Sequence, residues 1–186
     1  MFNLSTLEVV LSIEKSPILR KNGIIYQEYH NFFGNNILKE LKNLENLNFV
    51  QLEKQLDRPR RRVDYSDEIM KKIKLFFMQT PITKALEKKF NTNLSFDSVD
   101  IWQDEPGYYL EPHTDDSRVK LALQFYLGND NNVGTSLFDK DDNVLKTFEY
   151  KFNSGYALLN NEFSRHGTTT KVTNGIRKSM YVRYSQ

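Results

Sequence analysis

The sequence predicts a mainly β fold with flanking helices, an antiparallel sandwich or jelly roll. From about residue 95 the chain consists of short runs rich in β-branched and aromatic residues. Clusters of turn-forming residues separate these runs, at 128–132, 139–143 and 173–175. Before residue 95, apolar residues recur instead at helical spacing. We therefore expect helices from the first half to pack on the apolar outer face of a sheet.

Composition limits the classes of protein that fit. The 186 residues are 39% hydrophobic, enough for one core, so we expect a single domain, 1–186, with a mostly helical support region at 1–95 and a β core at 96–186. Cysteine is absent, which excludes disulfides, thiolate metal sites and a cysteine nucleophile. No apolar run approaches the roughly 18 residues of a membrane span, so a cytoplasmic protein without a membrane partner is expected.

Charge gives no reason to expect a nucleic-acid partner. The chain has 26 basic and 24 acidic residues, a net charge of +2. One local exception is the basic cluster at 58–62, Arg-Pro-Arg-Arg-Arg. Because acidic residues flank so short a run, we interpret it as a solvated loop.

Two helices and two strands can be predicted individually. Apolar spacing favours a helix over 32–47, and a second helix should begin at Thr80-Pro81, with threonine as its cap. In a strand at 120–127, alternate residues face opposite sides, which separates an apolar face from one carrying Gln124 and Tyr126. The last strand, 176–184, repeats this pattern, with polar groups including Arg177 facing a shared interior.

Two of the three histidines lie close to strand ends in the β-rich half, His113 and His166. Residues two apart in an extended segment share a face, so His113 and Asp115 can reach one metal ion together, and His166 can join them. Two imidazoles and one carboxylate leave coordination positions open, as non-haem Fe(II) needs to bind a chelating co-substrate and O₂. Asp116 is a rival ligand, but it should face the other way. The third histidine, His30, is interpreted as a surface or packing residue.

Arg177 and Ser179 also share one strand face. A guanidinium pairs well with a carboxylate, so together they form a predicted site for a small diacid. Trp102 and Tyr109 are interpreted as core or cavity-wall aromatics.

These residues carry a family resemblance. Residues 99–185 resemble the double-stranded β-helix (cupin-like) core of Fe(II)/2-oxoglutarate-dependent dioxygenases, most closely the prolyl 4-hydroxylase-like branch. The segments that carry it occur in the family's order: Gly107, His113-Thr114-Asp115, Tyr126-Leu127-Gly128-Asn129, Val133-Gly134-Thr135-Ser136-Leu137, the stretch 153–159, His166-Gly167 and Gly175-Ile176-Arg177-Lys178-Ser179. One departure is Val133-Gly134, where the family has a glycine pair.

The resemblance implies specific roles. His113, Asp115 and His166 would hold Fe(II), and Arg177 would bind the distal carboxylate of 2-oxoglutarate with help from Tyr126 and Ser179. Gln103 matches a position that contacts the co-substrate in relatives. The implied reaction is hydroxylation of an unactivated C–H bond by O₂, with release of succinate and CO₂, on a peptidyl, prolyl or small amino-acid-type substrate.

Two alternatives stay open at this point. A nucleic-acid-directed oxygenase for demethylation or repair would use the basic cluster at 58–62 as a phosphate contact. A non-catalytic metal-binding β-barrel would retain the metal ligands alone. Halogenation is not expected, because it requires the carboxylate ligand to be missing.

Overall fold

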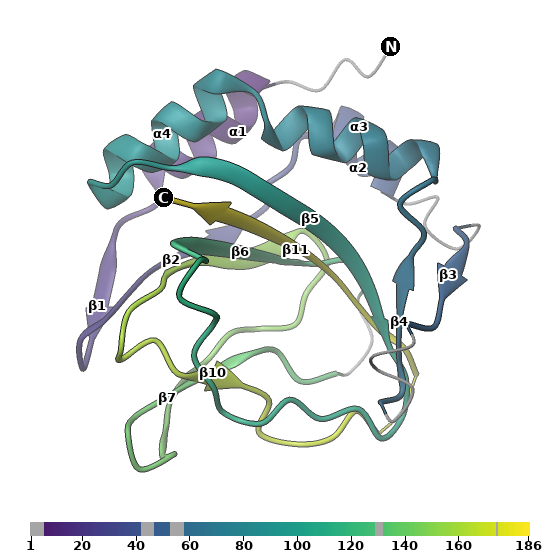
Figure 1. Cartoon of the computed structure of the whole chain (residues 1–186), viewed down its shortest axis with the longest axis vertical. Helices are drawn as coiled ribbons and strands as arrows, with labels where there is room; N and C mark the ends of the chain where they lie inside the picture. The colour runs from purple at the N-terminus through teal and green to yellow at the C-terminus, as the bar shows by residue number, and fades with distance from the viewer. Residues whose placement is uncertain (1–5, 42–46, 53–57, 129–131, 174) are drawn as a thin grey trace.

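A computed structural model describes residues 6–41, 47–52, 58–128, 132–173 and 175–186. In these ranges the chain forms two antiparallel sheets with helices on the outer side of the larger one (Figure 1). The helices of the described part are α1 (Thr6–Lys15), α2 (Asn35–Leu41), α3 (Glu68–Phe77) and α4 (Thr80–Phe90). No helix among these residues is both long and apolar enough to cross a membrane.

Within the described residues, eight strands form the larger sheet, in the order β1-β2-β9-β6-β11-β5-β4-β3, and three form the smaller one, in the order β10-β7-β8. The strands of the larger sheet are β1 (Leu19–Lys21), β2 (Ile24–His30), β3 (Phe49–Val50), β4 (Arg60–Val63), β5 (Ser95–Asp104), β6 (Leu121–Tyr126), β9 (Ser154–Leu159) and β11 (Arg177–Ser185). Those of the smaller sheet are β7 (Ser136–Phe138), β8 (Val144–Thr147) and β10 (His166–Gly167). The predicted mainly β class with flanking helices is confirmed.

Alternation along the central strands assigns one face of the large sheet to the core and the other to a polar interior. On β6, Leu121, Leu123 and Phe125 belong to the same cluster of buried side chains as the apolar residues of the helices. Gln124 and Tyr126 point toward the smaller sheet, as predicted. On β11 the same split places Arg177 on the interior side.

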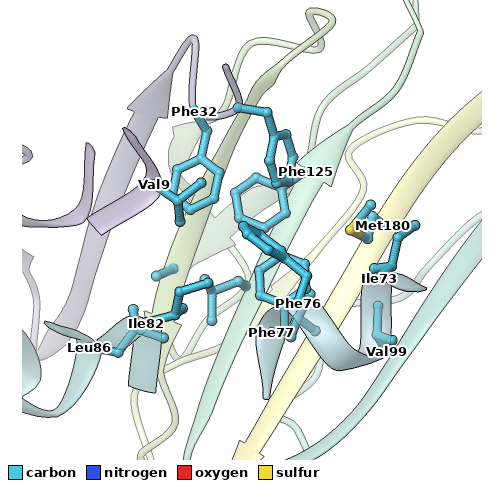
Figure 2. Close-up of a cluster of buried hydrophobic side chains, with 14 of the residues drawn as sticks. Val9, Phe32, Ile73, Phe76, Phe77, Ile82, Leu86, Val99, Phe125 and Met180 are labelled. Atoms are coloured by element: carbon cyan, nitrogen blue, oxygen red, sulfur yellow. The ribbon is translucent and has the colours of Figure 1, made fainter. Parts of the chain in front are cut away.

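Aromatic packing joins the helices to the sheet. The ring of Phe125 lies 4.3 Å from Phe32, 4.9 Å from Phe33 and 6.1 Å from Phe77, measured between centroids. Figure 2 shows this cluster together with apolar residues of α1, α3 and α4, such as Ile82. Each fully buried side chain of this kind contributes about 1.5–3 kcal/mol. The large sheet is thereby a stable platform for the side chains on its opposite face.

The N-terminal region also supplies strands that the sequence analysis did not predict. β1 and β2 form a hairpin through Asn22 and Gly23, whose φ angles of 48° and 82° suit the tight turn between them. β2 then pairs with β9, so this region enters the large sheet. Of the helix predicted at 32–47, the structure shows α2 over residues 35–41; residues 32–34 and residue 47 are not helical, and residues 42–46 lie outside the described part. The second predicted helix is confirmed as α4, but Gln79, not Thr80, occupies its cap position.

Candidate metal centre

The structure brings together the three predicted metal ligands. His113 and Asp115 lie in the segment between β5 and β6, and His166 begins β10. One ligand atom from each residue falls within 4.8 Å of the others. His166 Nε2 lies 3.8 Å from Asp115 Oδ1. The three side chains therefore converge on a point where one cation can touch all of them.

Backbone pairing positions the two imidazoles. The amide of His113 donates to the carbonyl of His166 at 3.0 Å, and the amide of His166 donates back at 2.8 Å. Each ring also has its Nδ1 close to a backbone carbonyl, that of Glu111 at 2.8 Å and that of Ser164 at 3.0 Å. A carbonyl oxygen only accepts, so each Nδ1 carries a proton, and in the metal-binding form of each ring the Nε2 lone pair is the one that faces the metal.

Electrostatics also favours ligation by His166. Burial lowers the pKa of its imidazole and outweighs the opposing effect of the Asp115 charge. The ring is therefore held in the neutral form that binds metals. The rival ligand, Asp116, is exposed and pairs with Arg118 at 3.0 Å, so it points away from the site as predicted.

One amide side chain connects the segments that carry the ligands. Asn160 Nδ2 donates to the carbonyl oxygens of Val119 at 2.9 Å and Asp116 at 3.1 Å. Its Oδ1 accepts a bond of 2.9 Å from the hydroxyl of Ser164, two residues before His166. The loop of the first two ligands is thus tied to the loop of the third.

A cavity of about 110 Å³ opens beside the three ligands. Gln124 projects into it from β6. Its Oε1 accepts from the hydroxyls of Thr135 at 3.0 Å and Tyr156 at 2.7 Å, which turns its amide nitrogen toward the cavity. The cavity is lined by Arg60, Trp102, Leu110, His113, Asp115, Gln124, His166 and Tyr181. Trp102 is thus the cavity-wall aromatic that was expected, whereas Tyr109 lies in a neighbouring groove at the surface.

Arg177 is buried on the same face of the sheet, as predicted, with only 1% of its surface exposed. Its guanidinium donates to Asp104 Oδ2 at 2.6 Å, to the carbonyl of Val133 at 3.1 Å and to the hydroxyl of Thr135 at 3.3 Å. Burial alone would lower the pKa of Arg177, but the Asp104 charge raises it, so the guanidinium is positively charged. Arg177 therefore already has a carboxylate partner inside the protein.

A second arginine, missed by the sequence analysis, shares that partner. Arg60 pairs with Asp104 through two hydrogen bonds, at 2.5 and 3.2 Å, and its side chain is only 12% exposed. Arg62 is 18% exposed, whereas Arg61 between them is 48% exposed. The interpretation of 58–62 as a solvated loop is wrong, because residues 60–63 form β4 and every second side chain turns inward.

The other predicted co-substrate contacts differ in their placement. Tyr126 is buried, and its hydroxyl accepts a bond of 2.7 Å from the amide of Thr135. Ser179 is also buried, and within the described residues its hydroxyl has no hydrogen-bond partner. Gln103 does not reach the interior. It lies one residue from both Trp102 and Asp104 on β5, and so on the opposite face of the sheet.

The residues present fit the groups that the resemblance implies. Two imidazoles and a carboxylate form the donor set that suits Fe(II). Arg60 and Arg177 together carry two positive charges against one negative charge on Asp104, so an enclosed surplus of one positive charge remains. The unpartnered hydroxyl of Ser179 adds a hydrogen-bond donor on the same strand face as Arg177. A small acid with a carboxylate at each end would engage the cation at one end and this charged region at the other.

Glycine is required at one position beside this region. A Cβ atom at Gly134 would lie 1.8 Å from the carbonyl oxygen of Phe148 and 3.3 Å from the Tyr126 hydroxyl. Position 134 therefore has no room for a side chain, which gives a steric reason for its glycine. At the preceding position, Val133 contributes only its carbonyl, to Arg177, so a side chain is tolerated there.

Comparison with known proteins identifies solved structures that have a similar fold. No protein-family model matches the sequence, and no curated protein matches it. Solved structures do match in shape. A prolyl hydroxylase in complex with a hypoxia-inducible-factor peptide fragment, from Trichoplax adhaerens, has a TM-score of 0.64 at 14% identity and covers 97% of this chain and 88% of its own.

Two further neighbours extend this similarity. A 2OG-Fe(II) oxygenase family oxidoreductase from Burkholderia pseudomallei has a TM-score of 0.62 at 13% identity over 98% of this chain and 91% of its own. HygX from Streptomyces hygroscopicus, solved with nickel, 2-oxoglutarate and hygromycin B bound, has a TM-score of 0.62 at 14% identity over 86% and 82%. The double-stranded β-helix fold that the sequence predicted is confirmed.

Proposed function

We propose that this chain is an Fe(II)- and 2-oxoglutarate-dependent dioxygenase that hydroxylates an unactivated C–H bond and releases succinate and CO₂. The observation that carries the proposal is the convergence of His113, Asp115 and His166 over the sheet face that also carries the buried, positively charged Arg177. Fe(II) with 2-oxoglutarate supplies O₂ activation coupled to oxidative decarboxylation of the keto acid. The chain acts as one domain in this proposal, because strands from both its halves pair in one sheet.

The protein's own contribution is binding and orientation. His113, Asp115 and His166 hold the cation and leave its remaining positions to co-substrate and O₂. Arg177, Ser179 and Tyr126 receive the distal carboxylate, and the amide nitrogen of Gln124 offers a further hydrogen bond inside the cavity. No side chain is assigned as a general base, because positioning and exclusion of water suffice for this chemistry.

The expected class of substrate is taken from solved structures with a similar fold. Similar folds bind a peptide in the Trichoplax protein and the small molecule hygromycin B in HygX. A prolyl 4-hydroxylase-like activity on a peptidyl or small amino-acid-type substrate is the first expectation. The surface groove formed by Arg58, Tyr109, Leu110, Glu111 and His113 reaches a metal ligand and gives such a substrate an approach.

The alternative functions lack a supporting feature. A nucleic-acid-directed oxygenase would need the basic cluster to face phosphates, but Arg60 and Arg62 turn inward to Asp104 and Asp100. A non-catalytic metal-binding module would not need a binding site for a co-substrate carboxylate. This chain keeps the buried guanidinium of Arg177, which could form such a site.

The proposal is tested by loading the protein with Fe(II) and measuring succinate formed from 2-oxoglutarate across candidate peptides, amino acids and metabolites. At least one candidate should raise succinate formation above the rate without substrate. Co-crystallisation with Mn(II) and 2-oxoglutarate without oxygen should show the cation on the three ligands. A cation bound elsewhere, or a keto acid that does not reach it, would refute the assignment.

A further inference from the structure

Three charged residues form a single row across neighbouring strands, and one of them, Arg60, lines the cavity beside the metal ligands. Asp104 on β5 is paired in register with Arg177 on β11 and with Arg60 on β4. Asp104 is fully buried and receives hydrogen bonds from both guanidinium groups, from Arg60 on both of its oxygens and from Arg177 on Oδ2. One carboxylate therefore serves two arginines.

Because Arg60 and Arg177 share Asp104, more positive charge is left for a ligand than a single arginine–aspartate pair would leave. If Asp104 had only Arg177 as partner, the pair would be neutral, and a second carboxylate would meet no net attraction. Asp104 interacts most extensively with Arg60, which contributes two of the three bonds. Arg177 makes one hydrogen bond to Asp104, and its bonds to the Val133 carbonyl and the Thr135 hydroxyl go to neutral groups, so the charge of its guanidinium is only partly neutralised.

The position of Arg60 is itself well determined. Its guanidinium carbon lies 4.1 Å from the ring centre of Tyr108 and 4.7 Å from that of Trp102. Stacking on aromatic rings and a two-point pairing with a carboxylate both require the planar guanidinium of arginine. These contacts keep Arg60 against Asp104 rather than in solvent.

We propose that Arg60 is a specificity-determining residue for the distal carboxylate of the co-substrate. By sharing Asp104 it leaves Arg177 with a positive charge that a 2-oxo diacid can neutralise, and so selects 2-oxoglutarate over 2-oxo monoacids. This inference rests on the proposed function and deepens it. Arg60 acts through Asp104 and Arg177 and does not need to touch the co-substrate.

The test compares two keto acids that chelate a metal equally but differ at the far end. Calorimetry on the Mn(II)-loaded full-length protein measures dissociation constants for 2-oxoglutarate and for 2-oxobutanoate, which has no distal carboxylate. The ratio of the two constants isolates the distal interaction. The variants are Arg60→Met, Arg60→Met with Asp104→Asn, and Arg61→Met as a matched control, since Arg61 lies on the same strand but on the outer face, paired with Glu105.

Arg60→Met should weaken 2-oxoglutarate binding at least about tenfold, because a desolvated charge is lost from the network, and leave 2-oxobutanoate binding unchanged. Adding Asp104→Asn should restore the preference to within about threefold, since the neutralising carboxylate is then gone. Arg61→Met should bind both acids like the parent protein. Thermal unfolding of each variant separates a folding defect from a binding defect, and Arg60→Lys, which keeps the charge, should show a smaller loss.

Two outcomes would overturn the inference. In one, Arg60→Met keeps the full preference for the diacid. In the other, the preference is lost but Asp104→Asn does not restore it, which would mean that Arg60 acts through shape. Failure of the proposed function looks different, because the parent protein itself would then bind neither keto acid in a Mn(II)-dependent way.

Discussion

Tyr126→Phe separates the structural role of a buried hydroxyl from its role in co-substrate binding. The hydroxyl accepts a 2.7 Å hydrogen bond from the amide of Thr135, and the ring is fully buried. Removing one oxygen leaves that buried N–H without a partner, which costs about 1–3 kcal/mol of folding stability. The variant should also bind 2-oxoglutarate about tenfold or more weakly, because a hydrogen bond to a carboxylate contributes about 1.5–3 kcal/mol.

Tyr150→Phe is the matched control. The Tyr150 hydroxyl accepts from the amide of Lys178 at 2.8 Å and donates to its carbonyl at 3.1 Å, so its removal should cost at least as much stability. Its ring lies 5.7 Å from the Arg177 guanidinium, but we assign its hydroxyl no contact with the co-substrate. Urea unfolding measures stability, and calorimetry with Mn(II) and 2-oxoglutarate measures affinity. Equal affinities of the two variants for 2-oxoglutarate would refute the reasoning about Tyr126.

Further predictions address the metal, the core and the alkaline limit of stability. Asp115→Ala should abolish substrate-dependent succinate formation and weaken Mn(II) binding, whereas Asp116→Ala should leave both unchanged. Full turnover by the first variant would exclude Asp115 as a ligand. Phe125→Ala should lower the free energy of unfolding by about 3–5 kcal/mol in urea, and a loss below 1 kcal/mol would show that its ring contacts contribute little. Burial raises the pKa of Tyr108 to about 12. Its protonated form is therefore favoured by folding, so Tyr108 should contribute about 3 kcal/mol to the loss of stability between about pH 10 and pH 12. Other buried tyrosines with raised pKa values add to this loss, so Tyr108→Phe should make the decline shallower by the Tyr108 contribution, and an unchanged slope would contradict the assignment. Because the Tyr108 hydroxyl has no partner among the described residues, the same variant should be no less stable at pH 7.

Local spacing was sufficient to predict the residues that share a strand face. His113 and Asp115 lie two apart, as do Arg177 and Ser179, and in both cases the structure directs the pair to the interior. Convergence with His166, across more than fifty residues of chain, followed from the family resemblance rather than from spacing.

What the sequence analysis missed involved contacts between distant segments. The Asn22-Gly23 pair is a strong hairpin signal and would have identified β1 and β2. Arg60 and Arg62 alternate with the exposed Arg61 in the way a strand requires, but a cluster of arginines ordinarily indicates a solvated surface. Only tertiary structure brings Asp104 against the two arginines, because the pairing of β4, β5 and β11 is not encoded locally.

The reciprocal backbone bonds between His113 and His166 have a consequence for engineering. Because main-chain atoms make this pairing, the two positions stay adjacent whatever side chains they carry. Position 115 is also held through main-chain atoms, because the Asn160 side chain donates to the carbonyl oxygens of Asp116 and Val119, which follow it in the chain. The scaffold is thus suited to ligand exchange, in which cysteine or glutamate installed at 113, 115 or 166 would change the choice of metal while the surrounding architecture is retained.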